Sequence, residues 1–347
     1  MKTILRTFVG CTAILFGTAC MGAVKYVPEN MKVELSLKVP GNNAVNYKLH
    51  PDKLENSYFD YEWRSDNKLP ITVFHKVEER DSCMRLTVQL TAAQDVYFNY
   101  RQLLSTGYRH DNCQFYMPGF WYRRNLRSPK KAPSFHTSDS WLVREDRLSA
   151  PLTGIFSEKE KRFMTVNRLD DFSMDALATH KEGEIILSGK TSLGFTGFEN
   201  QQGIAMLSFG FPYREAPKSY IRKLTLAPEV EAFQLMKKGE SVLLTWEIME
   251  SGADDFSDFI QHTWEHCYDT YAPKPVENSY SIADMKQVLS CFFVNSLVDN
   301  QPLVYNSGIH LKVSDCERNG QAEVGFIGRV LLNAFNAWEY GWQSNRE

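Results

Sequence analysis

The feature that most constrains the fold is a change in hydrophobic period near residue 254. Before this point, several short runs alternate apolar and polar residues, which is the pattern of half-buried strands. After it, apolar residues recur at helical spacing, which is the pattern of amphipathic helices. No helix-period segment separates the strand-like runs, so alternating strand–helix units are excluded. The sequence therefore predicts a mainly β chain with C-terminal helices.

The strand-like part spans residues 24–250 and contains seven clear runs. They are 32–39, 71–74, 85–90, 163–166, 184–187, 204–209 and 242–249. Turn-forming segments such as Pro40-Gly41-Asn42-Asn43 and Lys181-Glu182-Gly183 lie between them. Many strands joined by short turns favour a large antiparallel β-sandwich, of the size called a supersandwich.

The helical part begins with a linker helix within residues 251–276. Asp254 or Asp255 can cap its start, and Pro273 ends it because proline lacks the N–H that a helix needs. A second helix is expected to open at Ser281, with Asp284 in the capping-box position. A third is expected over residues 326–340, ended by Gly341. Its apolar stripe comprises Phe326, Ile327, Val330, Leu331, Ala334, Phe335 and Trp338.

Little of this sequence is available to cover the apolar stripe of the third helix, because only two helices precede it. An amphipathic helix needs a partner that buries its apolar face. We therefore expect residues 277–347 to be the beginning of a helical domain, and the chain to be the N-terminal portion of a larger protein.

The N-terminus has the pattern of an export signal over residues 1–23. Lys2 and Arg6 precede an apolar stretch over 7–16 that is too short to span a bilayer. The segment Gly17-Thr18-Ala19-Cys20 resembles a loose bacterial lipobox, which would make Cys20 a lipidated N-terminus. Lipidation and free secretion both stay open. Either way we expect an exported protein, periplasmic or attached to the outer membrane of a Gram-negative bacterium.

Composition and charge narrow the range of partners. Hydrophobic residues make up 43% of the chain and aromatic residues 13%, enough for a substantial core. The formal net charge of −3 gives no reason to expect binding to nucleic acid. The chain also lacks the glycine-rich phosphate loops, the HExxH motif and the GxSxG elbow. No cofactor is expected.

The cysteines and histidines give no clear metal site. The cysteines beyond the export signal are Cys83, Cys113, Cys267, Cys291 and Cys316. Their spacing includes no CxxC pair, so a structural zinc site is not expected, whereas Cys83 and Cys113 could pair after export. His262 and His266 have a spacing that permits metal binding on a helix. Because no third ligand is evident, they are predicted to be solvent-exposed and no metal is expected.

The aromatic segment 115–125 is the main candidate for ligand binding. Sugars present flat CH faces and a rim of hydroxyls, so their sites combine aromatic rings with planar hydrogen-bonding groups. Trp121, Tyr122, Arg123 and Asn125 meet this description and follow a Pro118-Gly119 turn. The alternative is that Trp121 belongs to the core and the arginines form surface ion pairs. A wider aromatic surface could include Tyr97, Tyr100 and Tyr108.

Candidate catalytic carboxylates are harder to identify. Glu145 and Asp146 are adjacent, and in an extended segment they point to opposite faces, so structural salt bridges are favoured. Glu317 and Glu323 lie in the loop that leads to the last helix, from which either could reach a cavity of a helical domain. These two residues are the catalytic candidates, with surface solvation as the alternative.

Three segments together carry a family resemblance. The linker helix ends in Tyr271-Ala272-Pro273-Lys274-Pro275, the last helix begins at Val324-Gly325-Phe326-Ile327-Gly328-Arg329, and the aromatic loop contains Met117-Pro118-Gly119-Phe120-Trp121-Tyr122. With an exported sandwich before them, they resemble glycoside hydrolases built from an N-terminal β-sandwich and a C-terminal (α/α)6 barrel, and more remotely polysaccharide lyases. The resemblance implies that residues 277–347 begin an (α/α) toroid.

Three functions are considered; the first and third follow from this resemblance, and the second belongs to a different class in which the short helices only cap the sandwich. The first is the N-terminal portion of an exported glycoside hydrolase that acts on oligo- or polysaccharides and is inactive alone, because most of its barrel lies beyond this sequence. The second is a non-catalytic glycan-binding lipoprotein, held to the membrane through Cys20. The third is a polysaccharide lyase, which needs a tyrosine or histidine base. All three share a carbohydrate partner.

Overall fold

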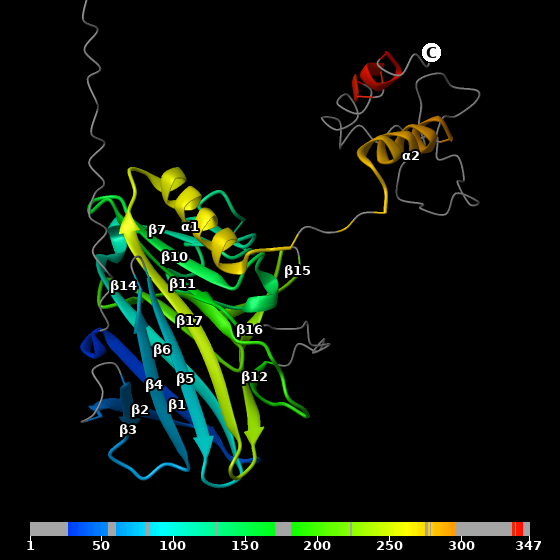
Figure 1. Cartoon of the computed structure of the whole chain (residues 1–347). Helices are drawn as coiled ribbons and strands as arrows, with labels where there is room; N and C mark the ends of the chain where they lie inside the picture. Colours follow the sequence, from blue (N-terminus) through cyan, green and yellow to red (C-terminus); the bar gives the residue numbers. More distant parts are fainter. Residues whose placement is uncertain are drawn as a thin grey trace, which may run out of the picture. The chain divides into compact units, whose positions relative to one another are not determined.

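The computed structural model describes residues 27–54, 60–80, 83–129, 131–170, 182–222, 224–274, 277, 279–295, 335–336 and 338–342. Contacts between Cα atoms divide the chain into two compact units, Met1–Ala272 and Pro273–Glu347. The first contains nearly all the described residues and all the strands (Figure 1).

The described residues of the first unit form seventeen strands and three short 3-10 turns. The strands are β1 Met31–Lys38, β2 Val45–Lys53, β3 Asp60–Arg64, β4 Ile71–Glu79, β5 Cys83–Ala92, β6 Val96–Arg109, β7 Cys113–Met117, β8 Trp121–Arg123, β9 Trp141–Arg144, β10 Leu152–Ser157, β11 Arg162–Arg168, β12 Gly183–Ile186, β13 Phe195–Gln201, β14 Ile204–Phe211, β15 Arg214–Arg222, β16 Thr225–Met236 and β17 Ser241–Gly252. The 3-10 turns are η1 Pro28–Asn30, η2 His110–Asn112 and η3 Glu145–Arg147.

The strands form two mainly antiparallel layers that share β2; the exception is β12, which pairs in parallel with β16. One layer runs β2-β3-β4-β5-β17-β11-β10-β7-β8. The other runs β2-β1-β6-β14-β13-β9, and β6 also pairs with β16, which carries β15 and β12. Rings from the two layers meet in the core, where Trp246 of β17 lies 5.1 Å from Phe209 and 6.4 Å from Tyr100 between centroids. The mainly β prediction is confirmed, and the arrangement is consistent with the predicted sandwich.

Each of the seven predicted runs overlaps a strand. Apolar and polar residues alternate along a strand when one of its faces is buried and the other is exposed, so this pattern locates strands directly. The longest strand, β6, was not predicted. It is buried along much of its length, so its apolar residues do not alternate cleanly with polar ones. Tyr100 is fully buried and Tyr108 is 6% exposed. The expectation of a wider aromatic surface is therefore wrong for these two residues.

The linker helix is α1, Phe256–Tyr271. Asp255 caps its start by accepting hydrogen bonds from the N–H groups of Ser257 and Asp258, and Ala272 ends it with φ of 40°. The buried face of α1 consists of Phe256, Phe259, Thr263 and Cys267. Figure 1 shows α1 lying across one end of the sandwich near β7, β10 and β11.

Gly154 of β10 allows α1 to approach the sheet closely. A Cβ atom on this glycine would lie 2.5 Å from the ring of Phe259. That ring also packs against Phe156 of β10 and Phe163 of β11, at centroid distances of 5.9 and 5.0 Å. The linker helix is therefore part of the first unit and shares its own small core with the sandwich.

The second unit contains α2, Ile282–Asn295, and helical residues 335–336 and 338–342. The capping box is confirmed, because Asp284 and Ser281 exchange hydrogen bonds at 2.9 and 3.2 Å. The helix continues through Gly341 to Trp342, so the predicted end at Gly341 is wrong. Residues 326–334 of the predicted third helix lie outside the described residues.

Large apolar side chains of the second unit are exposed. Ile282 is 75% exposed, Phe335 54% and Trp338 66%. Phe335 and Trp338 belong to the predicted apolar stripe of the third helix, but the described helices do not establish the start of a toroid. No helix in the described ranges is both long and apolar enough to cross a membrane.

Candidate functional site

The four predicted sugar-contacting residues lie in and after the hairpin formed by β7 and β8. In this hairpin Tyr116 pairs with Tyr122, and the turn between the strands uses Gly119 with φ of 81°. Successive residues of a strand point to opposite faces. Trp121 therefore points into the protein, whereas Tyr122 points outward, so the four candidates have different environments.

Trp121 belongs to the core. It is fully buried, its indole N–H donates to the carbonyl of Arg123, and its ring lies 5.1 Å from Phe198 and 5.8 Å from Trp141. A ligand at the surface cannot reach this ring. The burial of Trp121 argues against the expected contact role and agrees with the alternative in which this residue belongs to the core.

Asn125 holds the loop in shape. Its side-chain oxygen accepts a hydrogen bond from the N–H of Tyr122, and its amide group donates to the carbonyls of Phe120 and Pro133, at 3.0–3.2 Å. Its φ is 47°, a left-handed conformation that asparagine tolerates better than most residues. These bonds fix the backbone at Tyr122, so Asn125 positions this residue.

Tyr122 and Arg123 are both exposed. Tyr122 is 51% exposed, its ring lies 5.4 Å from that of Tyr116, and its hydroxyl accepts the N–H of Gly119. The guanidinium of Arg123 lies 4.8 Å from the centre of the Phe256 ring, within cation–π range. This contact orients the cation next to α1.

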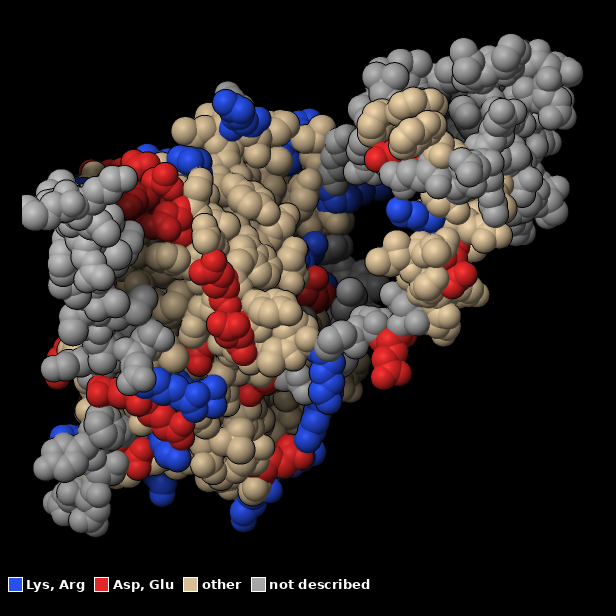
Figure 2. All heavy atoms as spheres, turned by 45° about the horizontal axis from the view of Figure 1, so that its top comes forward, with Lys and Arg blue, Asp and Glu red and all other residues tan. Residues whose placement is uncertain are grey.

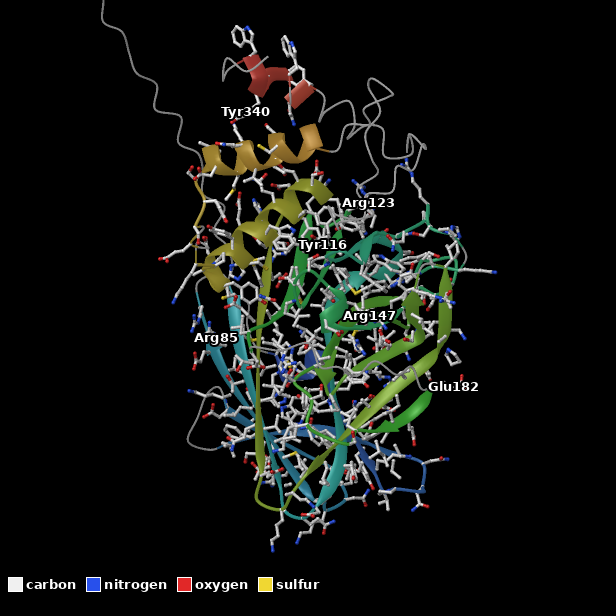
Figure 3. The ribbon with its side chains drawn as sticks, turned by 90° about the vertical axis from the view of Figure 1, so that its right-hand side faces the viewer. Arg85, Tyr116, Arg123, Arg147, Glu182 and Tyr340 are labelled. Atoms are coloured by element: carbon white, nitrogen blue, oxygen red, sulfur yellow. The ribbon has the colours of Figure 1, made fainter. Side chains whose placement is uncertain are left out.

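Helix α1 adds two aromatic residues that were not among the sequence candidates. The indole N–H of Trp264 donates to the hydroxyl of Tyr116 at 2.7 Å, so Trp264 and Tyr122 both contact the buried Tyr116. Trp264 is 38% exposed, and Tyr268, one turn further along α1, is 65% exposed. We call Tyr122, Arg123, Trp264 and Tyr268 the aromatic surface. Figure 3 shows Tyr116 and Arg123 at the α1 end of the sandwich.

A signal for the two helical residues was present in the sequence. Trp264, Tyr268 and Tyr271 all follow the helical period, yet the buried face of α1 contains only Phe256, Phe259, Thr263 and Cys267. The apolar stripe is thus wider than the face that packs on the sheet. In Figure 2, which turns this end of the sandwich forward, uncharged residues form most of the visible face, crossed by a row of acidic side chains.

The carboxylates predicted to be structural form ion pairs. Glu145 is fully buried and binds Arg168 at 2.6 Å, and Asp146 binds Arg144 at 2.7 Å. Glu145 and Asp146 lie in the turn η3 and not in an extended segment. The alternation of side chains along a strand, from which their opposite orientations were predicted, therefore does not apply to them. Both carboxylates are nevertheless used in salt bridges, as expected. The catalytic candidates Glu317 and Glu323 and the lipidation candidate Cys20 lie outside the described residues.

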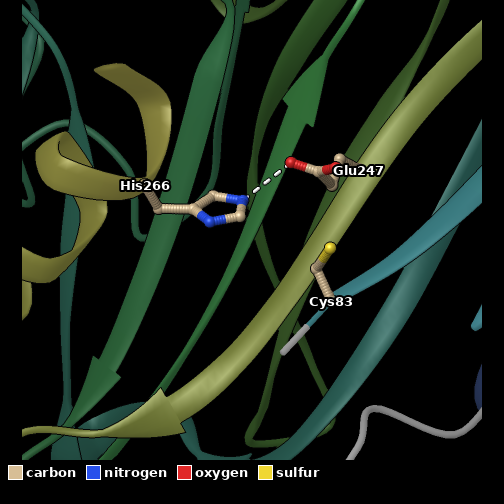
Figure 4. Close-up of side chains that lie close together, drawn as sticks. All are labelled: Cys83, Glu247 and His266. Carbon is tan, nitrogen blue, oxygen red and sulfur yellow. Dashed lines mark hydrogen bonds and ion pairs between the residues drawn. The ribbon is translucent and has the colours of Figure 1, made fainter. Parts of the chain in front are cut away.

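A second cluster of chemically active side chains lies between α1 and the sheet. His266 of α1 is 2.7 Å from a carboxylate oxygen of Glu247 in β17, and Cys83 of β5 lies beside them (Figure 4). The ligand atoms of these three residues lie within 4.8 Å of one another. Thr270 also donates to Glu247, at 3.2 Å. The sequence indicated only His266, because the other two residues come from distant strands.

Burial and charge act together on this cluster. Burial and the neighbouring Glu247 raise the pKa of the Cys83 thiol to about 11. Two effects on the pKa of Glu247 oppose each other. Burial by itself would raise this pKa, but the hydrogen bond and charge of His266 outweigh burial, so the pKa lies below its ordinary value. The carboxylate of Glu247 is therefore ionised at neutral pH, and the thiol of Cys83 is protonated.

The remaining predictions about cysteine and histidine are partly wrong. Cys83 and Cys113 are both free and buried, so the disulfide considered for them is not formed in this structure. His262 is 40% exposed by side chain and lies 3.4 Å from Asp258, as expected for a surface histidine. His266 is half-buried and faces Glu247, so the two histidines do not share a ligand.

No protein-family model matches this chain, and no curated protein sequence matches it. Among solved structures, a polysaccharide lyase aligns at 13% identity and a TM-score of 0.33, over 67% of this chain and 27% of its own. A galactose mutarotase related enzyme from Lactobacillus acidophilus aligns at 10% identity and 0.33, over 63% and 79%. A GH36 alpha-galactosidase from Geobacillus stearothermophilus aligns at 11% identity and 0.31, over 65% and 30%.

All three neighbours are named as carbohydrate-active enzymes. This chain spans about a quarter of the lyase and under a third of the alpha-galactosidase.

Proposed function

We propose that this chain binds a carbohydrate at the aromatic surface, as the β-sandwich part of an exported carbohydrate-active protein. One observation carries the proposal. The partly exposed side chains of Tyr122 and Trp264 both contact the buried Tyr116, and the guanidinium of Arg123 lies 4.8 Å from the centre of the Phe256 ring.

The chemistry of these groups suits a sugar. Aromatic rings offer a flat apolar face to the CH groups of a pyranose, and their ordering costs little because each side chain has only two χ angles. Arg123 provides a planar set of N–H donors for hydroxyl or carboxylate oxygens. Tyr122 accepts the N–H of Gly119, and its own O–H can donate to a sugar oxygen.

Burial of the supporting residues stabilises the arrangement. Tyr116 is 2% exposed, and burial raises the pKa of its phenol to about 12, so it stays neutral near pH 7. The neutral hydroxyl accepts the indole N–H of Trp264 and thereby links the β7–β8 hairpin to α1. A ligand would meet two rings whose separation is set by the fold, which lowers the entropic cost of binding.

The proposal extends to a glycoside hydrolase whose catalytic groups belong to the helical part, with Glu317 and Glu323 as candidates. The polysaccharide lyase hypothesis is less well supported at this surface. A lyase needs a tyrosine or histidine base, and burial raises the pKa of Tyr116, which opposes its use as that base.

Substitution of Trp264 or Tyr122 by alanine is expected to weaken glycan binding by about tenfold or more each, because aromatic anchors at an interface contribute roughly 1–2 kcal/mol. An oligosaccharide array probed with the full chain identifies ligands, and calorimetry on the strongest gives the Kd for each variant. Tyr280→Ala is the control, since this tyrosine is 63% exposed but belongs to the second unit. Unchanged Kd values in both surface variants would refute the proposal.

We also propose export and lipidation at Cys20. Expressed in a Gram-negative host, the full chain is expected in the membrane fraction, carrying a covalent lipid that mass spectrometry detects on the mature N-terminus. Cys20→Ser is expected to move the protein to the soluble fraction or leave it unprocessed, whereas Cys11→Ser has no such effect. An unmodified N-terminus in the parent protein would contradict lipidation, and cytoplasmic retention would contradict export.

A further inference from the structure

We propose that Cys83, Glu247 and His266 bind a divalent metal ion of the zinc type. The three side chains come from β5, β17 and α1, and their ligand atoms lie within 4.8 Å of one another (Figure 4). They converge at the junction between the sandwich and the linker helix, and none of them belongs to the aromatic surface. Neither the glycan proposal nor the fold requires this combination of residues.

The types of ligand favour zinc. Zinc binds thiolate sulfur, imidazole nitrogen and carboxylate oxygen in tetrahedral geometry, whereas magnesium and calcium prefer oxygen ligands alone. A thiol, an imidazole and a carboxylate thus exclude the hard cations as the preferred occupant. Three protein ligands leave a fourth position for water, and the side chain of His266 is 24% exposed, which gives solvent access.

The distances need only a small adjustment. With metal–ligand bonds of about 2.0–2.3 Å, neighbouring ligand atoms of a tetrahedral site lie roughly 3.3–3.6 Å apart. The hydrogen bond between His266 and Glu247 is 2.7 Å long, so these atoms must separate by about 0.6 Å. Cys83 Sγ must approach them.

The surrounding charges permit binding and make it dependent on pH. One neighbouring cation is Arg85, whose guanidinium lies 3.6 Å from the second oxygen of Glu247. Arg80 also faces Cys83, and Cys267 and Tyr271 of α1 face Glu247. Binding converts the Cys83 thiol into a metal-bound thiolate and releases its proton to solvent. Affinity is therefore expected to fall as the pH is lowered.

The consequence for the protein is a link between α1 and the sheet. An ion that binds the folded chain but not the unfolded one raises the free energy of unfolding, by an amount that grows with the logarithm of its affinity. Because one ligand belongs to α1 and two belong to strands, the ion ties the linker helix, and with it Trp264, to the sandwich. Metal binding should therefore also protect the aromatic surface from local opening.

The test is zinc titration of the full chain under a phosphine reductant, with a fluorescent chelator as competitor. One tight equivalent is expected, together with a higher midpoint of thermal unfolding. Cys83→Ala and His266→Ala should each lower the affinity by at least about 100-fold, since even substitutions outside the ligand shell cost roughly 10- to 100-fold. His262→Ala and Cys113→Ser are the matched controls and should bind like the parent protein.

A second measurement does not depend on any variant folding correctly. Cobalt bound to the parent protein should show a thiolate-to-metal charge-transfer band and the d–d bands of a tetrahedral site, because Cys83 is a ligand. The proposal is overturned if the folded parent takes up no stoichiometric zinc. It is equally overturned if the cobalt spectrum lacks the thiolate band, or if Cys83→Ala and the control variants bind equally well.

Discussion

Replacement of Arg168 by methionine is expected to destabilise the first unit by about 3–5 kcal/mol, the usual cost of leaving one member of a buried ion pair uncompensated. Arg168 is 3% exposed and donates at 2.6 Å to Glu145, which is fully buried. The same guanidinium binds Asp170 at 3.0 Å and the carbonyl of Ser192. Denaturant unfolding of the parent and variant measures the difference.

A matched control separates burial from charge. Arg162 lies in the same strand and pairs with Glu250 at 2.9 Å, but its side chain is 45% exposed. Arg162→Met should cost only about 0–1 kcal/mol, because solvent screens an exposed pair. The double variant Arg168→Met with Glu145→Gln should recover part of the loss, since no buried charge then remains. If Arg168→Met costs no more than Arg162→Met, the role assigned to burial is wrong.

Replacement of Phe259 by alanine is expected to cost about 3–5 kcal/mol, the range for removing a large buried aromatic ring. Phe259 is fully buried and contacts Phe156, Phe163 and Tyr116 from α1. Because it seats the helix on Gly154, its loss should also loosen the contact of α1 with the sheet. Hydrogen exchange along α1, measured with the unfolding free energy, tests both effects.

The control for Phe259 is a residue on the opposite side of the same helix. Tyr268 is 65% exposed, and Tyr268→Ala should change the unfolding free energy by less than about 0.5 kcal/mol. Phe259→Ala should also weaken glycan and zinc binding, because Trp264 and His266 are both carried by α1. Unfolding free energies that match for the two variants would show that α1 does not depend on this aromatic packing.

The strands and helices were predictable where the spacing of apolar residues within one segment reflects which face of that segment is buried. Alternation located β1, β4, β5 and β17, and the helical period with its capping residues located α1 and α2. The pairing of the strands could not be predicted in this way, because it depends on contacts between distant segments. Strand β6 was missed because it is paired on both edges and buried along much of its length.

The sites were predictable only in part for the same reason. The aromatic segment near Tyr122 was identified from composition, but its residues alternate between core and surface, and composition alone left both placements of Trp121 open. Trp264 reaches Tyr116 from a helix far along the chain. Likewise, the sequence showed His266 without the carboxylate and thiol that β17 and β5 bring to it.

The most direct test of the account is a crystal structure of the full chain with an oligosaccharide selected on the array. We predict that a sugar ring lies within about 4.5 Å of the Tyr122 or Trp264 ring, with a hydroxyl or carboxylate oxygen bonded to Arg123. A bound oligosaccharide at another place on the sandwich, with both rings left in solvent, would contradict the account.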